Sequence, residues 1–493
     1  RPTFFFKQMP IPIRVISTDL RIVNTRLRMP FRFGITTVTV VPHLFVSAVV
    51  EIDGRRAQGI AADFLPNKWF TKDPATSFED DIKDMLAIIR MACDIAQAGG
   101  ARASVFDLWE HLRLAHSAWA GGWGYPPLLA AFGPSLVERA VIDAFCRDQE
   151  ISFSTALREN RLGIQLGRVH SELSGAEPRD LLPAQPLRSI IVRHTVGLTD
   201  PLTDSEITDD QRVNDGLPQS LEANIAAYGL THFKIKLWGD VKRDQERVRK
   251  VAEVIAKGCG NRYAYTLDGN ENFKAVEPYR EFWAGLTQDA ALKDFLGHVM
   301  FVEQPLHRSV ALSPEIAGEF SRWPDRPPTL IDESDGSLTS VREALDLGYV
   351  GSSHKNCKGV IKGIANACLL EHRRRSDGSR LYMQSAEDLT NIGPVALMQD
   401  LCVVGNLGIT HAERNGQHYF KGLSMFGPSI QDAVLKSHPD SFRRHADGYA
   451  TLRVENGAVE IGSMVDRHFG VGAAIDVSQF TPADQWTFQS LIG

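Results

Sequence analysis

Residues 231–258, THFKIKLWGDVKRDQERVRKVAEVIAKG, contain one complete strand–turn–helix unit. The first part, THFKIKLWG, is an apolar run interrupted by two lysines and is typical of a strand. The second part places Val248, Val251 and Ile255 at helical spacing and ends on Gly258, a residue type that commonly terminates helices. The segment therefore predicts a strand followed by a helix that packs on it.

The same order of elements repeats through the middle of the chain. Helix-like segments such as SVREALDLG (340–348) and IKGIANACLLEHRRR (361–375) separate short apolar runs that are typical of buried strands. Alternating strands and helices predict a parallel sheet, and eight such units within about 230 residues favour a (β/α)8 barrel over a doubly wound sheet. The strand candidates are RSIIVRHTVGL, THFKIKLWG, RYAYTLDGN, HVMFVEQP, PTLIDES, YVGSSHKN, SRLYMQSAE and NLGITHAER.

The residues on either side of the barrel predict a second structural unit. Stretches rich in Val, Ile, Phe and Thr come first, with a hairpin signal, DGRR, at 53–56, and helix-forming stretches follow them. We expect an α+β domain over 1–187, the barrel over 188–423, and a C-terminal segment, 424–493, that packs back on the first domain. The Trp-, Gly- and Pro-rich stretch HSAWAGGWGYPPLLAAFGP indicates a loop or an insertion near 100–130.

The composition is that of an ordinary globular protein. Of 493 residues, 43% are hydrophobic and 23% are charged, and the formal net charge of −6 gives no support to nucleic-acid binding. No apolar stretch approaches the length, about 18 residues, that spans a membrane, and RPTFFFKQMPIPIR at the start lacks the long apolar core of a signal peptide. Six scattered cysteines without C-x-x-C spacing indicate reduced thiols. We therefore expect a cytoplasmic protein with neither nucleic acid nor membrane as a partner.

Acidic residues follow three successive strand candidates. Asp268, Glu303 and Asp332 each come after an apolar run, and in such barrels the functional residues lie at the C-terminal ends of the strands. Neighbouring parallel strands are about 4.8 Å apart, so the three side chains can converge on one point. Converging carboxylates repel one another unless a cation neutralises them, and an all-oxygen ligand set favours Mg²⁺. The alternative is that each acid separately caps a helix or accepts hydrogen bonds from a loop.

Lysines mark two other strand ends. Lys234 and Lys236 are two apart on one strand and project to the same face, where each would lower the pKa of the other and allow a neutral general base. The alternative is a solvent-exposed strand face. Lys355, four strands further round, would stand on the opposite side of the barrel mouth, with Lys358 as the rival candidate. His354 faces the other way from Lys355, as a structural histidine would.

Together these motifs resemble the enolase superfamily. The runs FKIKLWG, LDGNENF, VEQP, LIDES and SSHKNCKGV are most similar to the branch of the mandelate racemase and muconate lactonizing enzyme group that contains muconate lactonizing enzymes and dipeptide epimerases. The resemblance implies a (β/α)8 barrel of the TIM type with an N-terminal α+β capping domain completed by the C-terminal tail. FRFGITTVTVVPHLFVSAVVEIDGRRAQG is similar to the strands of that capping domain.

The resemblance also implies roles for individual residues. Mg²⁺ would be held by three carboxylates, and two lysines would stand at opposite faces of the substrate. The seventh strand, YMQSAEDLTNIGP, leaves open whether Gln384, Glu387 or Asp388 enters the site, and the sixth-strand motif lacks the usual Gly-Gly. The matching residues are Asp268, Glu303 and Asp332 for the metal, Lys236 and Lys355 for the two lysines, Lys234 as the neighbour that tunes Lys236 and touches the substrate carboxylate, and Asn270 and Glu333 as polar groups beside the ligands or the substrate.

The implied reaction removes the proton α to a carboxylate and stabilises the resulting enediolate with Mg²⁺. Reprotonation then gives racemisation or epimerisation, loss of a β-leaving group gives dehydration, and ring opening or closing gives cycloisomerisation. Lysines on both faces suit epimerisation most directly, and the absence of a His-Asp dyad argues against a site of the mandelate racemase type. Two alternatives differ in class: a barrel lyase that forms a Schiff base, which leaves the three acids unexplained, and a non-catalytic barrel.

Two further expectations concern the surroundings of the site. The substrate would be a small-molecule carboxylate, and the protein would be a homo-oligomer with an even number of subunits, as is common for barrels of this family. Aromatic residues of the capping domain either close over the site, which would give the substrate an apolar portion, or form core between the domains. These residues are Phe31, Phe33, Phe64, Trp69 and Phe70.

Overall fold

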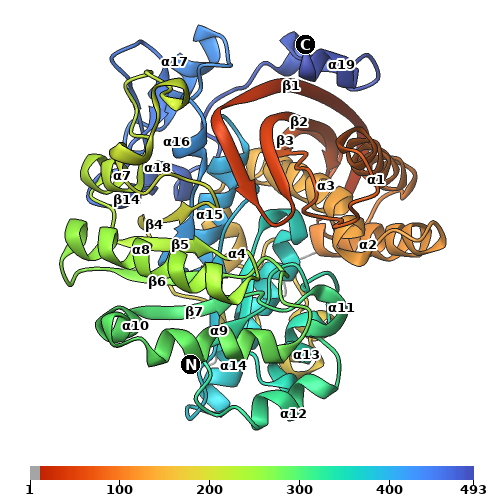
Figure 1. The fold of residues 1–493 in the computed structure, drawn as a ribbon. Helices are drawn as coiled ribbons and strands as arrows, with labels where there is room; N and C mark the ends of the chain where they lie inside the picture. The colour runs from red at the N-terminus through yellow and green to blue at the C-terminus, as the bar shows by residue number, and fades with distance from the viewer. Residues whose placement is uncertain (1–10) are drawn as a thin grey trace.

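The computed structural model describes residues 11–493; the first ten residues of the expected 1–187 domain lie outside this range. In the described chain β1 (Ile13–Phe33), β2 (Thr36–Ile52) and β3 (Arg55–Phe64) form an antiparallel sheet in which each strand pairs with the next (Figure 1). Asp53 and Gly54, with φ of 49° and 80°, make the two-residue turn between β2 and β3. A turn with two positive φ values matches the twist of the flanking strands, so the predicted hairpin is confirmed.

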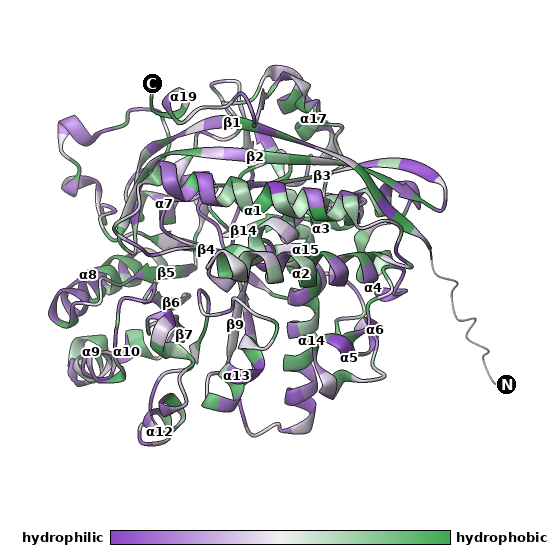
Figure 2. Ribbon diagram, turned by 90° about the vertical axis from the view of Figure 1, so that its right-hand side faces the viewer, coloured by the Kyte–Doolittle hydropathy of each residue, from purple (hydrophilic) through white to green (hydrophobic). Residues whose placement is uncertain are grey.

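Three long helices pack on this sheet: α1 (Phe78–Ala98), α2 (Val105–Gly122) and α3 (Pro127–Asp148). Helix α3 is buried along most of its length because the sheet lies on one side of it and the barrel on the other (Figure 2). Its approach to β3 requires Gly59, where an added Cβ would lie 2.0 Å from the carbonyl oxygen of Ala140. The α+β character of this domain is therefore confirmed.

The stretch 116–134 corrects one expectation. The sequence predicted a loop or an insertion there, and the loop is wrong, because α2 continues to Gly122 and α3 already begins at Pro127, so that 123–126 alone lie outside these two helices. The proline signal was misleading because Pro127 occupies the first turn of α3, where a missing N–H costs no helical hydrogen bond. Four short helices, α4 (Phe153–Arg158), α5 (Leu166–Val169), α6 (Pro178–Leu181) and the 171–173 turn, lead to the barrel.

Eight strands of the described chain form a parallel barrel sheet in the order β8-β7-β6-β5-β4-β11-β10-β9. Strand β8 is very short, and a bridge between Ile331 and Ser352 joins its end to β9 and so closes the barrel. The strands are β4 (Ser189–Val196), β5 (His232–Lys236), β6 (Ala264–Asp268), β7 (Val299–Glu303), β8 (Thr329–Leu330), β9 (Gly351–His354), β10 (Met383–Ala386) and β11 (His411–Glu413).

Helices between the strands cover the outside of the barrel (Figure 1). Helix α8 (Val241–Cys259) buries Val248, Val251 and Ile255, as its spacing predicted, but it ends two residues later than expected, at a glycine C-cap with φ of 61°, Gly260. The other principal helices are α7 (Leu221–Tyr228), α9 (Val276–Gln288), α12 (Glu315–Ser321), α13 (Ser340–Leu347), α14 (Val360–Ser376) and α15 (Ala396–Leu407).

The C-terminal segment completes the N-terminal sheet. Strand β15 (Thr481–Pro482) pairs antiparallel with Arg21 and Ile22 of β1, and α19 (Phe488–Ile492) packs on β1 and β2. The same segment also touches the barrel, because β14 (Ala458–Glu460) pairs with β4. The fold class predicted from the sequence, a (β/α)8 barrel with an α+β domain completed by the tail, is therefore confirmed.

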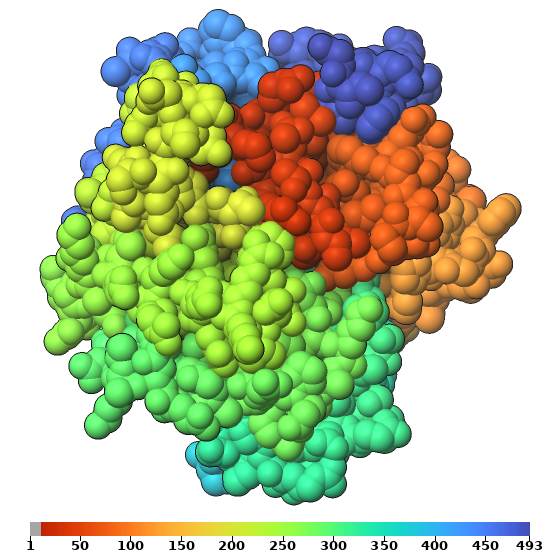
Figure 3. All heavy atoms as spheres, viewed as in Figure 1, coloured from red at the N-terminus to blue at the C-terminus, as the bar shows by residue number. Residues whose placement is uncertain are grey.

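The N-terminal domain lies over the barrel. Figure 3 shows the red atoms of this domain next to the yellow and green atoms of the first barrel units. Helix α3 contributes a direct connection, since the buried Glu138 carboxylate accepts the backbone N–H groups of Val360 (3.1 Å) and Ile361 (2.6 Å) at the start of α14. Within residues 11–493, every helix is too short or too polar to cross a membrane.

Candidate active site

The strand register brings the charged residues of β5, β6 and β7 to one level. Lys236 pairs with Asp268 across β5 and β6, and Asp268 pairs with Glu303 across β6 and β7. Because the strands are parallel, their C-terminal ends meet at the same rim of the barrel, below the N-terminal domain. Lys234, two residues before Lys236, points to the same side and is completely buried.

Lys234 lies at the centre of four carboxylates. Its Nζ is 2.9 Å from Asp268, 3.0 Å from Glu303, 3.0 Å from Glu387 and 2.8 Å from Glu413. The acids come from β6, β7 and the ends of β10 and β11, so this ammonium connects both halves of the barrel. A solvent-exposed strand face, the alternative considered for the two lysines, is therefore wrong.

These carboxylates reverse the expected direction of the lysine pKa shifts. Burial lowers the pKa of Lys234, but the surrounding acids raise it by more, and the pKa is held well above its usual value. The pKa of Lys236 is raised for the same reason, with Asp268 as its main partner at 2.6 Å. Sequence reasoning counted the second ammonium and missed the two acids on β10 and β11, which is why it predicted lowered values.

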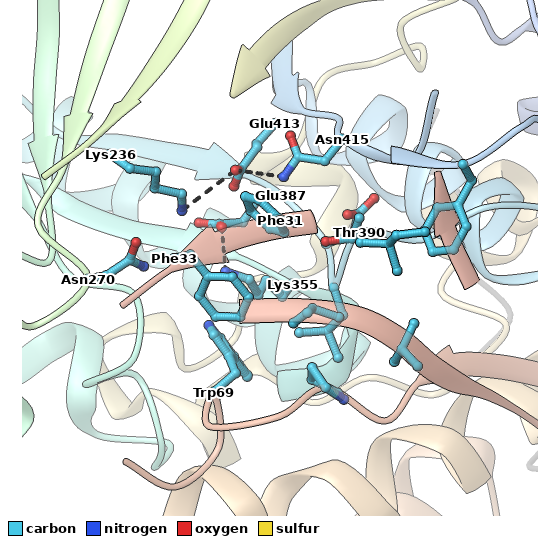
Figure 4. Close-up of a pocket in the computed structure, with 17 residues that line it drawn as sticks. Phe31, Phe33, Trp69, Lys236, Asn270, Lys355, Glu387, Thr390, Glu413 and Asn415 are labelled. Atoms are coloured by element: carbon cyan, nitrogen blue, oxygen red, sulfur yellow. Dashed lines mark hydrogen bonds and ion pairs between the residues drawn. The ribbon is translucent and has the colours of Figure 1, made fainter. Parts of the chain in front are cut away.

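The second lysine site lies across the barrel mouth from the first (Figure 4). Lys355 donates to Asp332 at 2.8 Å, forms an ion pair with Glu387, and stands over the Trp69 ring at 4.6 Å from its centroid. Lys358, the rival candidate, donates instead to the Asp332 carboxylate and to the backbone carbonyls of Asp332 and Ser353. Lys355 lines the cavity and Lys358 does not, so Lys355 is the lysine that a ligand in the cavity would meet.

Two carboxylates found here were not assigned from the sequence. Glu387 directly follows β10 and contacts both Lys234 and Lys355, while Glu413 ends β11 and contacts Lys234. Of the other seventh-strand candidates, Gln384 points toward Gly363 of α14, and Asp388 reaches the cavity wall but is ion-paired with Arg414. The strand-end rule that selected Asp268 would also have selected Glu387 and Glu413.

Three of the acids form a group that could hold a metal ion. Glu303, Asp332 and Glu387 each place a carboxylate oxygen within 4.8 Å of the others. The Oε2 atom of Glu303 is buried without a hydrogen-bond partner, and burial together with Glu387 raises the pKa of Glu303 well above its usual value. Buried carboxylates that face one another in this way are stabilised by a cation. The all-oxygen donor set therefore fits Mg²⁺.

Asp268 lies beside this group rather than within it. Its carboxylate accepts from Lys236 at 2.6 Å and contacts Lys234 at 2.9 Å. Although burial raises its pKa, the two ammonium groups lower it by more, to about 2. Asp268 is thus an ionised acid next to the metal-type cluster, with both neighbouring lysines bound to it.

The remaining predicted residues form a hydrogen-bonded layer around Asp268. The backbone N–H of Asn270 donates to Asp268 at 2.8 Å, and its side-chain amide donates to Glu333 at 3.1 Å. Asn270 has φ of 40°, a conformation that asparagine tolerates better than most residues. His354 is buried and bonded to Asn356 at 3.0 Å, away from this layer.

A small cavity separates the charged rim from the N-terminal domain. Its free space is ≈ 50 Å³. Phe31, Phe33 and Trp69 line it, as Figure 4 shows, together with Lys236 and Lys355.

The other two capping-domain aromatics have a structural place. Phe64 stacks on Phe420 at 5.3 Å between ring centroids, and Phe70 packs on Phe132 at 4.4 Å. The alternatives left open by the sequence are therefore both realised, each by different residues: Phe31, Phe33 and Trp69 face the cavity, and Phe64 and Phe70 form core.

Solved structures with this fold identify its class. The chain superposes on a mandelate racemase/muconate lactonizing protein from Herpetosiphon aurantiacus (TM-score 0.57, 17% identity, covering 94% of this chain and 99% of that one). It also superposes on the dipeptide epimerase from Enterococcus faecalis V583 complexed with Mg and the dipeptide L-Leu-L-Tyr (0.58, 13%, 93% and 99%). A third match is the L-Ala-D/L-Glu epimerase from Bacillus subtilis (0.56, 14%, 94% and 100%).

The fold is therefore similar to that of mandelate racemase/muconate lactonizing proteins and dipeptide epimerases, and the fold that the sequence resemblance implied is confirmed. No protein-family model matches the sequence, and no curated protein matches it. At 13–17% sequence identity, the similarity to these structures establishes the architecture of the chain. The activity therefore has to be argued from the residues of the site.

Proposed function

We propose that the protein is a Mg²⁺-dependent isomerase or lyase that removes the proton α to the carboxylate of a small-molecule acid. The observation that carries the proposal is that Lys236 and Lys355 line opposite sides of one cavity, and that Glu387, which also lines it, belongs to a group of buried carboxylates. A carbon acid held between two lysines can lose its proton to one and regain a proton from the other.

Asp268, Glu303 and Asp332 are proposed as the residues that hold Mg²⁺; Glu387, whose oxygen lies within 4.8 Å of those of Glu303 and Asp332, is a further candidate, and Asp268 lies beside that cluster. When bound, the ion would neutralise these acids and the charge that develops on the substrate carboxylate. The chain itself supplies the positioning. Lys234 cannot move far, because four carboxylates hold its ammonium in a completely buried place.

Lys236 and Lys355 are proposed as the two acid–base groups. Each is held by a carboxylate at short range, Asp268 for Lys236 and Asp332 for Lys355. Those contacts fix the direction of each ammonium across the cavity and also keep it protonated. A lysine becomes a base here only when its carboxylate partner is engaged elsewhere, as it would be in a metal-loaded site.

Epimerisation or racemisation is the proposed outcome, because both faces of the substrate then meet a lysine. Elimination and cycloisomerisation need only one base and remain the second choice. A Schiff-base lyase is less well supported, since it gives no role to the five carboxylates of the rim.

The test is α-proton exchange in D₂O with the purified protein. Acid sugars, N-acyl amino acids and dipeptides would be incubated with Mg²⁺ or with EDTA, and the loss of each α-proton signal followed by NMR. We expect exchange only with Mg²⁺. Exchange that persists in EDTA, or a covalent adduct trapped by borohydride, would contradict the proposal and favour the lyase.

A further inference from the structure

The wall of the cavity opposite the charged rim is apolar. Most of its residues come from β1, β2 and the loop after β3, and they carry no charge. The barrel contributes two more apolar groups after β10 and β11. The apolar lining residues are Leu27, Phe31, Phe33, Val38, Val41, Pro66, Trp69, Leu389 and Phe420.

The cations that line the cavity are already bound. Among the described residues that line it, only Lys236 and Lys355 are positively charged, and each has an acidic partner within 2.8 Å. Other cations of the N-terminal domain are engaged away from it: Arg28 forms a bidentate pair with Asp215.

The next cation along β1 points outward. Arg32 alternates with Phe31 and Phe33, is exposed, and lies over the Trp238 ring at 4.5 Å. Lys72, from the loop before α1, pairs with Glu271 at 3.3 Å and does not line the cavity. A second carboxylate on a ligand would therefore enter the cavity without a free cation to receive it.

The acids of the lining are committed in the same way. Glu387 is paired with Lys234 and Lys355, Glu413 with Lys234, and Asp388 with Arg414. A ligand ammonium group would find no acid free of such a partner. Burying an unpaired charge of either sign is costly, whereas apolar groups gain from contact with this wall.

We infer that the substrate is a compact monocarboxylate whose remaining substituents are apolar and uncharged. This inference rests on the proposed function for the carboxylate end and adds the chemistry of the rest of the molecule. The carboxylate faces the lysines and the metal-type cluster, and an aryl or branched alkyl group packs on Phe31, Phe33 and Trp69.

Three matched acids test the inference: 2-phenylpropanoate, 2-phenylsuccinate, which adds a carboxylate, and 3-amino-2-phenylpropanoate, which adds an ammonium group. Binding to the Mg²⁺-loaded protein would be measured by calorimetry and α-proton exchange by NMR. We expect 2-phenylpropanoate to bind about 100-fold more tightly than either charged analogue. Equal or tighter binding of a charged analogue would overturn the substrate class.

Two variants separate the wall from the rim. Phe33→Lys places a cation at a half-buried position of the lining, and we expect it to shift the ratio of the binding constants about tenfold toward 2-phenylsuccinate. Thr37→Lys is the matched control, since Thr37 pairs with Arg32 across β1 and β2 and its side chain is exposed. An equal shift in both variants would overturn the role of the wall.

The readouts also distinguish this inference from the proposed function. Selective binding of 2-phenylpropanoate without α-proton exchange would support the substrate class and contradict the proposed reaction. Exchange of the charged analogues at the rate of 2-phenylpropanoate would support the reaction and contradict the substrate class.

Discussion

The two walls of the cavity are built on different principles. The barrel wall carries charged groups at strand ends, where the register of a parallel sheet fixes their height, as it does for Lys236 beside Asp268. The N-terminal wall consists of apolar side chains whose direction depends on how a whole domain docks. Phe31 faces the cavity, yet Phe64 at the end of β3 stacks in the core on Phe420. The position of the charged groups is thus set by strand register, and the shape of the apolar wall is set by how the N-terminal domain packs on the barrel.

The largest expected loss of turnover comes from a substitution in the barrel wall. Asp268→Asn should lower turnover by ~10³-fold or more, since a neutral amide is a weaker Mg²⁺ ligand than a carboxylate and cannot form an ion pair with Lys236. The fold should remain, judged by circular dichroism. Mg²⁺ affinity, measured by calorimetry, gives a readout that does not depend on a substrate. Full turnover together with tight Mg²⁺ binding would remove Asp268 from the metal site.

Glu387→Gln tests whether a second acid of the barrel wall is a Mg²⁺ ligand. Because Glu387 lies within 4.8 Å of the oxygens of Glu303 and Asp332, its substitution should weaken Mg²⁺ binding by about tenfold or more if it is a ligand. The exposed Glu281→Gln on α9 is the control and should leave the affinity unchanged. An unchanged affinity in Glu387→Gln would restrict the ligands to Asp268, Glu303 and Asp332.

Replacing each of the two lysines should stop α-proton exchange on a different face of the substrate. In D₂O, Lys236→Ala should stop exchange of one enantiomer and Lys355→Ala that of the other, each by about 10²- to 10⁴-fold, and both should lose racemisation. Lys358→Ala is to be compared with Lys355→Ala, because the Lys358 ammonium donates to the Asp332 carboxylate and to two backbone carbonyls. If Lys355→Ala still exchanged both enantiomers, a one-base elimination or cycloisomerisation would be favoured instead.

Trp69 belongs to the N-terminal wall and contacts Lys355 of the barrel wall. We expect its replacement to lower activity less than the substitutions of charged residues above. Its ring lies 4.6 Å from the Lys355 ammonium and also lines the cavity. Trp69→Leu keeps an apolar surface but removes the cation–π contact, which is worth about 1 kcal/mol. We expect a loss of about tenfold or less in kcat/KM, confined to the enantiomer handled by Lys355. Equal losses for both enantiomers would indicate a general packing defect.

The sequence predicted much of the barrel wall because strand ends are readable from apolar runs. Asp268, Glu303, Asp332 and Lys236 each follow such a run, and the structure brings them to one rim. Glu413 was missed although it follows the same rule in THAER.

The rest could not be predicted because it depends on contacts distant in sequence. The lysine pKa values rise through Glu387 and Glu413, which are more than 150 residues from Lys234. The stretch 116–134 was misjudged because glycine and proline are read locally as loop signals, whereas burial between the sheet and the barrel stabilises α3. The direction of each capping-domain aromatic likewise follows from docking and not from its neighbours in sequence.

The last expected effect is on stability and not on activity, and it concerns a contact between the N-terminal domain and the barrel. Glu138 of α3 accepts two backbone N–H groups at the start of α14, and burial, opposed by those hydrogen bonds, raises its pKa to about 7. A raised pKa in the folded state means that protonation stabilises folding relative to the ionised state. The stability contribution is complete below the unfolded value of about 4.5 and is lost as the pH rises through 7.

Glu138→Gln removes this titration. Urea unfolding of both proteins at pH 4.5 and pH 8 should show the free energy of unfolding of the wild type falling relative to the variant by about 1–3 kcal/mol over that interval. The variant should be less stable at both pH values, since an amide oxygen replaces two carboxylate oxygens and one N–H group loses its acceptor. The difference between the two pH values isolates the titration from that constant loss. A pH-independent difference would mean that Glu138 is ionised throughout and joins α3 to the barrel as a charged helix cap, and the two walls would then be held together equally well at every pH.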